Sequence, residues 1–207
     1  METADDLRTE SIDEEAPYAV ERGACSIIWE RKPDNAPRAW PDIAYQLFGM
    51  LTHYLPGLVI TRQWPDRVRE TWSLTCRVIW LADTPGKDNI NPRALSQLEE
   101  LIMNFIDEND GKAVVLLDGL EYLAVNNGLL QGVGANNGFL RTLMFVEHVN
   151  EFVMPWASVV LIPVDPDALE ETDRAMLRRN LQVRDGTNLK ADLSRREVIR
   201  RLESDRY

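Results

Sequence analysis

One stretch near the middle of the 207-residue chain constrains the fold more than any other. Residues 113–118 read Ala-Val-Val-Leu-Leu-Asp, a run of apolar residues that ends on an acid. A short run that is apolar at every position predicts a strand buried on both faces, and such strands lie inside parallel sheets covered by helices. Because α/β proteins bind ligands at the carboxyl ends of their strands, Asp118 is expected at a ligand-binding edge.

Apolar strand-like runs alternate with helical patterns along most of the chain. Further strands are predicted at residues 24–29, 58–61, 77–82 and 158–164. Between these runs the apolar residues recur at three- and four-residue spacing, which is typical of amphipathic helices. The alternation predicts an α/β fold, a three-layer sandwich with a mostly parallel central sheet of about five strands.

Local signals predict where the helices begin. Proline is favoured at the first helical position because the hydrogen bond that it lacks would not have formed there. Helix starts are predicted on this ground at Pro41, Pro65, Asn91-Pro92 and Asp165-Pro166. Residues 139–152 are apolar nearly all round and predict a deeply packed helix, whereas residues 184–187 (Arg-Asp-Gly-Thr) predict a loop.

The chain divides into three parts by composition. Residues 1–20 contain a cluster of acids that cannot be buried, and they predict a disordered acidic arm. Residues 21–182 hold the α/β domain. Residues 183–207 form an Arg-rich tail, in which the spacing of Ser194 and Glu197 predicts a short capped helix carrying Val198, Ile199 and Leu202.

Charge and cysteine usage exclude several classes of protein. The net charge of −11 argues against nucleic acid or an anionic membrane as the main partner, since both favour an excess of Lys and Arg. No run is long and apolar enough to span a membrane and no apolar signal core is present, so a cytoplasmic protein is expected. Two Cys and two His without a cluster predict no metal site and no nucleophilic catalytic arrangement.

The phosphate-binding half of a P-loop hydrolase is missing from the sequence. In such an enzyme Asp118 would bind Mg²⁺ and Glu121 would lie near the place of a base. A phosphate-binding loop needs glycines and a Lys directly after a strand, yet residues 31–38 and 62–65, which follow the first two strands, contain no glycine. Gly86-Lys87 is followed by Asp88 where Ser or Thr is needed. We therefore expect no hydrolysis, no cofactor and no enzyme activity.

Asp118 has three possible roles. It binds Mg²⁺, contacts a partner at the sheet edge, or caps the helix or turn that begins at Gly119. Arg62, at the end of another predicted strand, pairs with Asp118 if the two strands are neighbours. The glycine-rich stretch 126–138 repeats the motif Asn-Asn-Gly, and Trp40 and Trp64 lie beside prolines in predicted loops. The candidate binding residues are Arg62, Trp64, Asp118, Glu121, Asn126, Asn127 and Asn137.

Several segments, taken together and in order, resemble an uncharacterised archaeal family, domain-of-unknown-function family eight-three-five. They are residues 56–62, 65–70, 78–81, 90–92, 114–123, 137–139 and 163–169. Members of this family are often appended to sensory and histidine-kinase-like proteins. The family is similar to RecA-like ATPases of the circadian-clock type, with the Asp-bearing strand retained and the phosphate loop lost. The resemblance implies a degenerate P-loop/RecA-like fold and a signalling or scaffold role, and it brings no catalytic residues. The insertion 129–135 and the Arg-rich tail depart from the family pattern.

Three functions remain open at the level of the sequence. The first is a non-catalytic interaction or regulatory module in archaeal signalling, with a protein as its partner. The second is a protein, either a monomer or a homo-oligomer, that binds a nucleotide in the ancestral pocket without hydrolysing it. The third is a structural subunit whose apolar helical faces complete a larger assembly.

Overall fold

The computed structural model describes residues 20–34, 40–128 and 136–193. Its centre is a seven-stranded sheet with the strand order β4-β3-β2-β5-β6-β1-β7, in which each neighbouring pair is parallel. The strands are β1 (Ala24–Trp29), β2 (Gly57–Thr61), β3 (Arg77–Leu81), β4 (Asn89–Ile90), β5 (Val114–Asp118), β6 (Val159–Val164) and β7 (Gln182–Asp185). The helices are α1 (Ile43–Leu51), α2 (Pro65–Trp72), α3 (Leu95–Glu108), α4 (Leu120–Gly128), α5 (Asn136–Val153) and α6 (Glu171–Asn180), with a 3₁₀ turn at Pro166–Ala168 and a further helix over residues 186–193.

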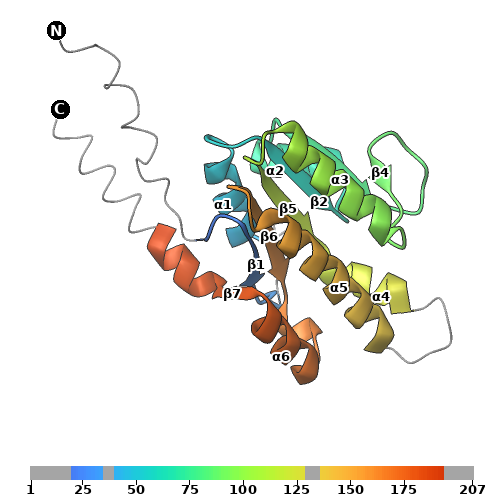
Figure 1. Ribbon diagram of the computed structural model, residues 1–207. Coiled ribbons are helices and arrows are strands. Elements are labelled where there is room, and N and C mark those ends of the chain that lie inside the picture. The colour runs from blue at the N-terminus through green and yellow to red at the C-terminus, as the bar shows by residue number, and fades with distance from the viewer. Residues whose placement is uncertain (1–19, 35–39, 129–135, 194–207) are drawn as a thin grey trace, which may run out of the picture.

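Helices cover both faces of the sheet, as Figure 1 shows. Alternate residues of β5 point to opposite sides: Val115 and Leu117 join the core formed with α3, α4, α5 and α6, whereas Val114 and Leu116 join the core formed with α1, α2 and helix 186–193. The three-layer α/β class and the parallel central sheet predicted from the sequence are confirmed, with β5 in the middle of the sheet between β2 and β6.

All five predicted strands exist, and the structure adds two short ones at the edges. The predicted loop at residues 184–187 is wrong, because β7 (Gln182–Asp185) pairs with β1 and a helix begins at Gly186. Ser26 in β1 donates a hydrogen bond of 2.7 Å to the side-chain oxygen of Gln182. A short, polar edge strand has no apolar run, so hydrophobic patterning could not reveal it.

Two of the predicted helix starts are also wrong. Asn91 accepts a hydrogen bond from the backbone N–H of Arg93 in a turn, and α3 begins only at Leu95. Asp165 accepts from the N–H of Asp167 and caps a single 3₁₀ turn, whereas α6 begins at Glu171. In both places Asn or Asp before proline stabilises a local turn, which uses the same signals as a helix start. The start at Pro65 is confirmed.

Parts of the predicted arm, insertion and tail lie outside the described residues. Of the acidic arm only Val20 is described, and it is buried. The insertion 129–135 and residues 194–207, including the predicted cap at Ser194, are not described. The first part of the predicted tail forms β7 and the helix over residues 186–193, in which Leu189 and Leu193 are buried in the α1-side core.

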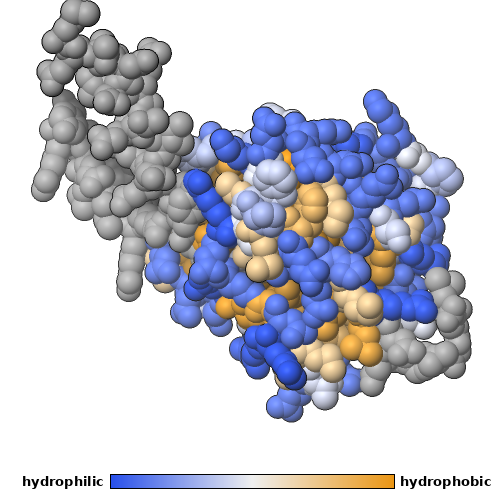
Figure 2. Space-filling model, viewed as in Figure 1, coloured by the Kyte–Doolittle hydropathy of each residue, from blue (hydrophilic) through white to orange (hydrophobic). Residues whose placement is uncertain are grey.

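Several hydrophobic side chains remain on the surface. Figure 2 shows them in orange on the face that carries α3, α5 and α6. Leu140 and Met144 on α5 and Met176 on α6 are exposed large hydrophobic residues. Among the described residues no helix has the length and apolarity needed to cross a membrane.

Candidate functional site

Asp118 lies at the carboxyl edge of the sheet, at the end of β5, with only 6% of its surface exposed. Its Oδ2 atom accepts hydrogen bonds from the Tyr45 hydroxyl (3.0 Å), the Thr61 hydroxyl (2.8 Å) and the Gln63 amide (2.9 Å). These donors come from α1, β2 and the residues that follow β2. The prediction that Asp118 caps the next helix is therefore wrong, because its carboxylate joins three other elements. Gly119, with φ of +142°, turns the chain directly from β5 into α4.

The surroundings of Asp118 disfavour its charged form. Burial raises the pKa of the carboxyl, while the hydrogen bonds from Gln63, Thr61 and Tyr45 and the charge of Arg62 oppose that effect. The pKa of Tyr45 lies well above its ordinary value, because its hydroxyl is buried and stands next to Asp118. The three donors are all neutral, so the carboxylate is held by hydrogen bonds instead of by a cation within bonding distance.

Arg62 is a neighbour of Asp118, as the sequence suggested, but not its ion-pair partner. The register of β2 and β5 aligns Thr61 with Asp118, and the Arg62 N–H donates to the Asp118 carbonyl at 3.3 Å. No ion pair within 4.0 Å joins the Arg62 and Asp118 side chains in the described part of the chain, and the Arg62 side chain is exposed. Its charge still lowers the pKa of Asp118.

Glu121 is also engaged by the protein itself. From the first turn of α4 its Oε1 atom accepts a hydrogen bond of 2.7 Å from the N–H of Asp165, just beyond the end of β6. Burial raises the pKa of Glu121, and the nearby charge of Asp118 adds to this effect. Glu121 therefore fastens α4 to the neighbouring strand.

Glu30, which sequence reasoning missed, forms the most informative contact at this edge. It follows β1 directly and is 6% exposed. Its Oε2 atom accepts from the N–H groups of Asp42 (2.8 Å) and Ile43 (2.9 Å), and its Oε1 atom accepts from the N–H of Ala44 (2.6 Å). These are the free N–H groups at the start of α1, where the helix dipole favours a negative charge.

This arrangement is the one in which a helix N-terminus binds an anion, with a carboxylate of the same chain as the anion. In a P-loop protein the N–H groups after the first strand bind phosphate; here a glutamate occupies them. Burial raises the pKa of Glu30, and the three backbone hydrogen bonds oppose that rise. One sequence signal could have pointed to Glu30, namely an acid directly after an apolar strand, as at Asp118.

The two described asparagines of the glycine-rich stretch have structural roles in packing α4. Asn126 and Asn127 lie in the last turn of α4 and are buried. Their amides donate within the helix, and Asn127 also donates to the Pro92 carbonyl at 3.0 Å, which joins α4 to the turn before α3. Asn137 lies in the first turn of α5, and its side chain is outside the described part. Gly138 lies so close to α4 that an added Cβ would come within 2.2 Å of the Ala124 carbonyl.

Trp64 fits the prediction of an exposed aromatic residue. It is 55% exposed and packs edge-on against Trp80, with ring centroids 5.0 Å apart. Trp80 in turn donates to the Arg62 carbonyl, so the indole of Trp64 stands beside Arg62 at the carboxyl edge. Trp40 is only partly exposed, and its indole N–H is buried without a hydrogen-bond partner.

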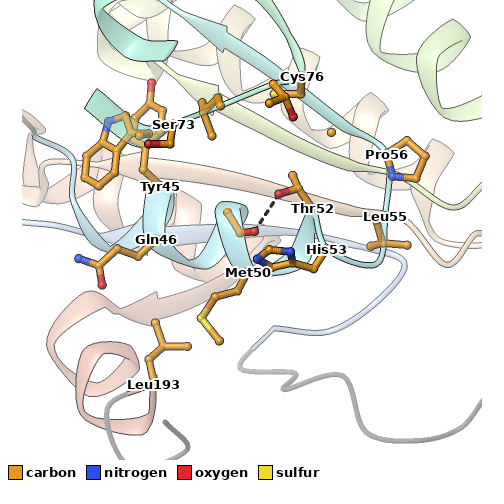
Figure 3. A pocket seen from close by; sticks show the side chains of 15 residues that line it. Tyr45, Gln46, Met50, Thr52, His53, Leu55, Pro56, Ser73, Cys76 and Leu193 are labelled. Atoms are coloured by element: carbon orange, nitrogen blue, oxygen red, sulfur yellow. Dashed lines mark hydrogen bonds between the residues drawn. The ribbon is translucent and has the colours of Figure 1, made fainter. Parts of the chain in front are cut away.

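A groove of about 840 Å³ lies at the other end of the sheet. Its lining includes Gly57 at the start of β2 and Cys76 just before β3, so it opens at the amino ends of these strands. Figure 3 shows the lining side chains around α1, from Tyr45 to His53, with Leu193 of helix 186–193 nearby. Within the described ranges no group of three or more His, Cys, Asp or Glu side chains could hold a metal ion.

Comparisons with known proteins agree with this architecture. The model of the family described as "Protein of unknown function (DUF835)" matches residues 41–181, so the chain belongs to this family. A structure of PH0250 from Pyrococcus horikoshii OT3 is similar with a TM-score of 0.53 and 13% identity, covering 80% of this chain and 83% of that one. The flagellar accessory protein FlaH from Methanocaldococcus jannaschii gives a TM-score of 0.49 and 12% identity over 80% of this chain and 72% of that one. The likeness to PH0250 shows a shared α/β fold. No curated protein matches the sequence.

Proposed function

We propose that this member of the DUF835 family is a non-catalytic regulatory or protein-interaction module of archaeal signalling, whose phosphate-binding end is closed by its own side chains. The proposal rests on one observation above all. The carboxylate of Glu30 accepts hydrogen bonds from the first N–H groups of α1 at 2.6–2.9 Å. A phosphate at this helix end would have to displace a buried carboxylate and would be repelled by it while it remained.

The other acids of the edge support the same proposal. A carboxylate that serves as a magnesium ligand or a general base must present an oxygen to the metal or the substrate. Three side chains donate to one oxygen of Asp118, and Glu121 is bound to the backbone of Asp165. Both acids therefore form structural hydrogen bonds, which would have to break before either acid could take part in a reaction.

Thermal unfolding with ATP, ADP, GTP and cyclic nucleotides, with and without Mg²⁺, tests this proposal. A ligand present at about 100 times its Kd would stabilise the protein by ~2.7 kcal/mol. For a chain of this size that corresponds to a rise in Tm of roughly 5–10 °C. We expect no shift from any nucleotide. A shift of that size that depends on Mg²⁺ would overturn the proposal.

Glu30→Ala and Glu30→Gln sharpen this experiment. Removing the carboxylate in Glu30→Ala leaves the N–H groups of α1 free for an external anion, so millimolar phosphate is expected to stabilise this variant and not the wild type. Glu30→Gln retains a side chain in the same place and serves as the matched control. An equal response of all three proteins to phosphate would show that Glu30 does not close the site.

Nucleotide binding without hydrolysis remains the second candidate, because two exposed side chains at the carboxyl edge favour it. The indole of Trp64 offers a surface on which a base could stack, and the exposed guanidinium of Arg62 stands beside it. If the nucleotide panel gives a shift, Trp64→Ala and Arg62→Ala should abolish it. Asp118→Asn, which keeps the buried network, should leave it unchanged.

A candidate surface for a protein partner lies on the layer of helices that contains α5 and α6. Leu140 and Met144, one helical turn apart on α5, and Met176 on α6 are among the exposed large hydrophobic residues of the described chain. Clustered apolar side chains on a soluble domain commonly mark a protein contact. Sedimentation of the wild type and of Met144→Glu would show whether this contact joins two copies of the chain.

A further inference from the structure

The groove over α1 has an unusual lining for this protein. More than a quarter of the chain is charged, yet among the described residues no Asp, Glu, Lys or Arg lines the groove. The floor contains the parallel stack of Tyr45 and Trp72, with ring centroids 5.0 Å apart. Met50, Leu74 and Leu193 add apolar surface. This lining offers no carboxylate, ammonium or guanidinium group to a charged ligand, and because Gln46, Thr52 and Thr75 stand beside its apolar residues, it suits an amphipathic helical segment.

Gly49 leaves open space beside α1. It lies inside the helix and lines the groove, and an added Cβ would meet no atom within 4 Å. Glycine inside a helix costs roughly 0.5–1 kcal/mol relative to alanine. No contact within the described residues requires a glycine here. A glycine on the surface of a helix, where no side chain projects, allows another chain segment to cross close to the backbone.

The sequence after Leu193 supplies a segment of suitable character. Leu193 lines the groove and is the last described residue, and fourteen residues of sequence follow it. On helix 186–193 the buried positions are Gly186, Leu189 and Leu193, and the same face would continue with charged residues. The capping spacing of Ser194 and Glu197 predicts a new helix, so the chain can change direction there.

The predicted helix after Ser194 has an apolar side and a basic side. Val198, Ile199 and Leu202 recur at helical spacing, while the segment carries five Arg against three acids. The rest of the chain holds the whole excess of negative charge. An amphipathic, basic helix therefore complements an acidic body with an uncharged groove.

We propose that the groove over α1 is a docking site for the chain's own segment 194–207, which crosses α1 at Gly49 with Val198, Ile199 and Leu202 facing the groove. This inference does not rest on the proposed function, because neither Glu30 nor Asp118 lines the groove. The docked segment covers Cys76, which lines the groove.

Two native cysteines make the test direct. Cys76 is partly exposed, whereas Cys25 is fully buried, so only Cys76 is within reach of a disulfide partner or a thiol reagent. In the full chain, Leu202→Cys places a thiol on the apolar side of the predicted helix. Arg200→Cys is the matched control, because it lies on the opposite side. Mild oxidation should give a disulfide within one chain for Leu202→Cys and little for Arg200→Cys.

The outcomes separate the possible occupants. A disulfide-linked dimer of Leu202→Cys would show that the tail of a second copy fills the groove, and equal cross-linking of both variants would indicate random collisions; either result overturns the proposal. As a second measurement, Val198→Asp with Leu202→Asp should raise the alkylation rate of Cys76 by about tenfold, which corresponds to ~1.4 kcal/mol of docking free energy. Arg200→Ala should leave the rate unchanged. An unaltered rate in the double variant, whether fast or slow, would mean that the segment does not cover Cys76.

Discussion

The two ends of the sheet differ in what their side chains contact. At the carboxyl ends the acids are buried and bound by partners within the chain, with Glu30 on the N–H groups of α1 and Asp118 on three side chains. At the amino ends an uncharged groove stays open over Gly49. The edge at which α/β proteins usually bind ligands is thus occupied by contacts within the chain, whereas the described residues leave a groove at the opposite end.

The largest effect is expected for Asp118→Ala. This change removes the acceptor of the buried Tyr45 and Thr61 hydroxyls and one of the two acceptors of the half-buried Gln63 amide, which also donates to the Trp40 carbonyl, and each unsatisfied buried group costs about 1–3 kcal/mol. We expect a loss of roughly 3 kcal/mol in the free energy of unfolding, measured by urea denaturation. Asp118→Asn retains an acceptor oxygen and removes a buried charge, so it should stay within about 1 kcal/mol of the wild type. Equal losses in both variants would contradict a role that depends on accepting hydrogen bonds.

Glu30→Ala is expected to have the next largest effect. Loss of a side-chain acceptor at a helix N-terminus costs roughly 0.5–2 kcal/mol, and the full burial of Glu30 places this variant near the upper end. Urea denaturation at low and high phosphate concentration would separate two contributions, since phosphate should recover part of the loss. A loss that phosphate does not change would argue that the closed helix end cannot accept an external anion.

Acidification should stabilise the protein, in contrast to the usual behaviour of carboxylates. The folded-state pKa values of Glu30, Asp118 and Glu121 lie above their ordinary values of 4.5, 3.8 and 4.5. The native state therefore holds protons that the unfolded state has released, and the contribution of these groups is present below the ordinary pKa and lost as pH rises through the folded pKa. We expect Tm to rise as pH falls from neutral toward these ordinary pKa values. Asp118→Asn should reduce this rise, and a Tm that falls over the same range in both proteins would contradict the prediction.

Gly49→Ala is expected to have the smallest effect, and it tests directly whether the groove at the amino ends of the strands is occupied. If the helix alone mattered, alanine would stabilise the protein by roughly 0.5–1 kcal/mol. An alanine side chain at position 49 would disturb the contact between α1 and a segment docked closely over it. The net gain in stability should therefore be smaller when Gly49→Ala is made in the wild type than when it is made in the variant with Val198→Asp and Leu202→Asp. Urea denaturation of these four proteins forms a double-mutant cycle, and strict additivity would argue against a close approach at Gly49.

Much of the fold could be predicted from the sequence, and little of the site. The runs at Val114–Asp118 and Val159–Val164 are apolar throughout, so their burial was evident from local composition. The two edge strands were missed because β4 has two residues and β7 is polar. Asp118 was recognised as a residue of the carboxyl edge, but its partners were not, since Tyr45 and Thr61 lie 73 and 57 residues away.

The sequence alone specifies the layers of this protein, because apolar runs and helical spacing indicate which faces are buried, whatever their neighbours. It also determined that the loops after the first two strands lack the glycines of a phosphate cradle. The contacts at the start of α1 became known only from the tertiary structure. Glu30 reaches Asp42, Ile43 and Ala44 across a loop, and no local pattern encodes that meeting. The physical reason is that a hydrogen bond depends on the position of both partners, whereas burial depends mainly on the residue itself.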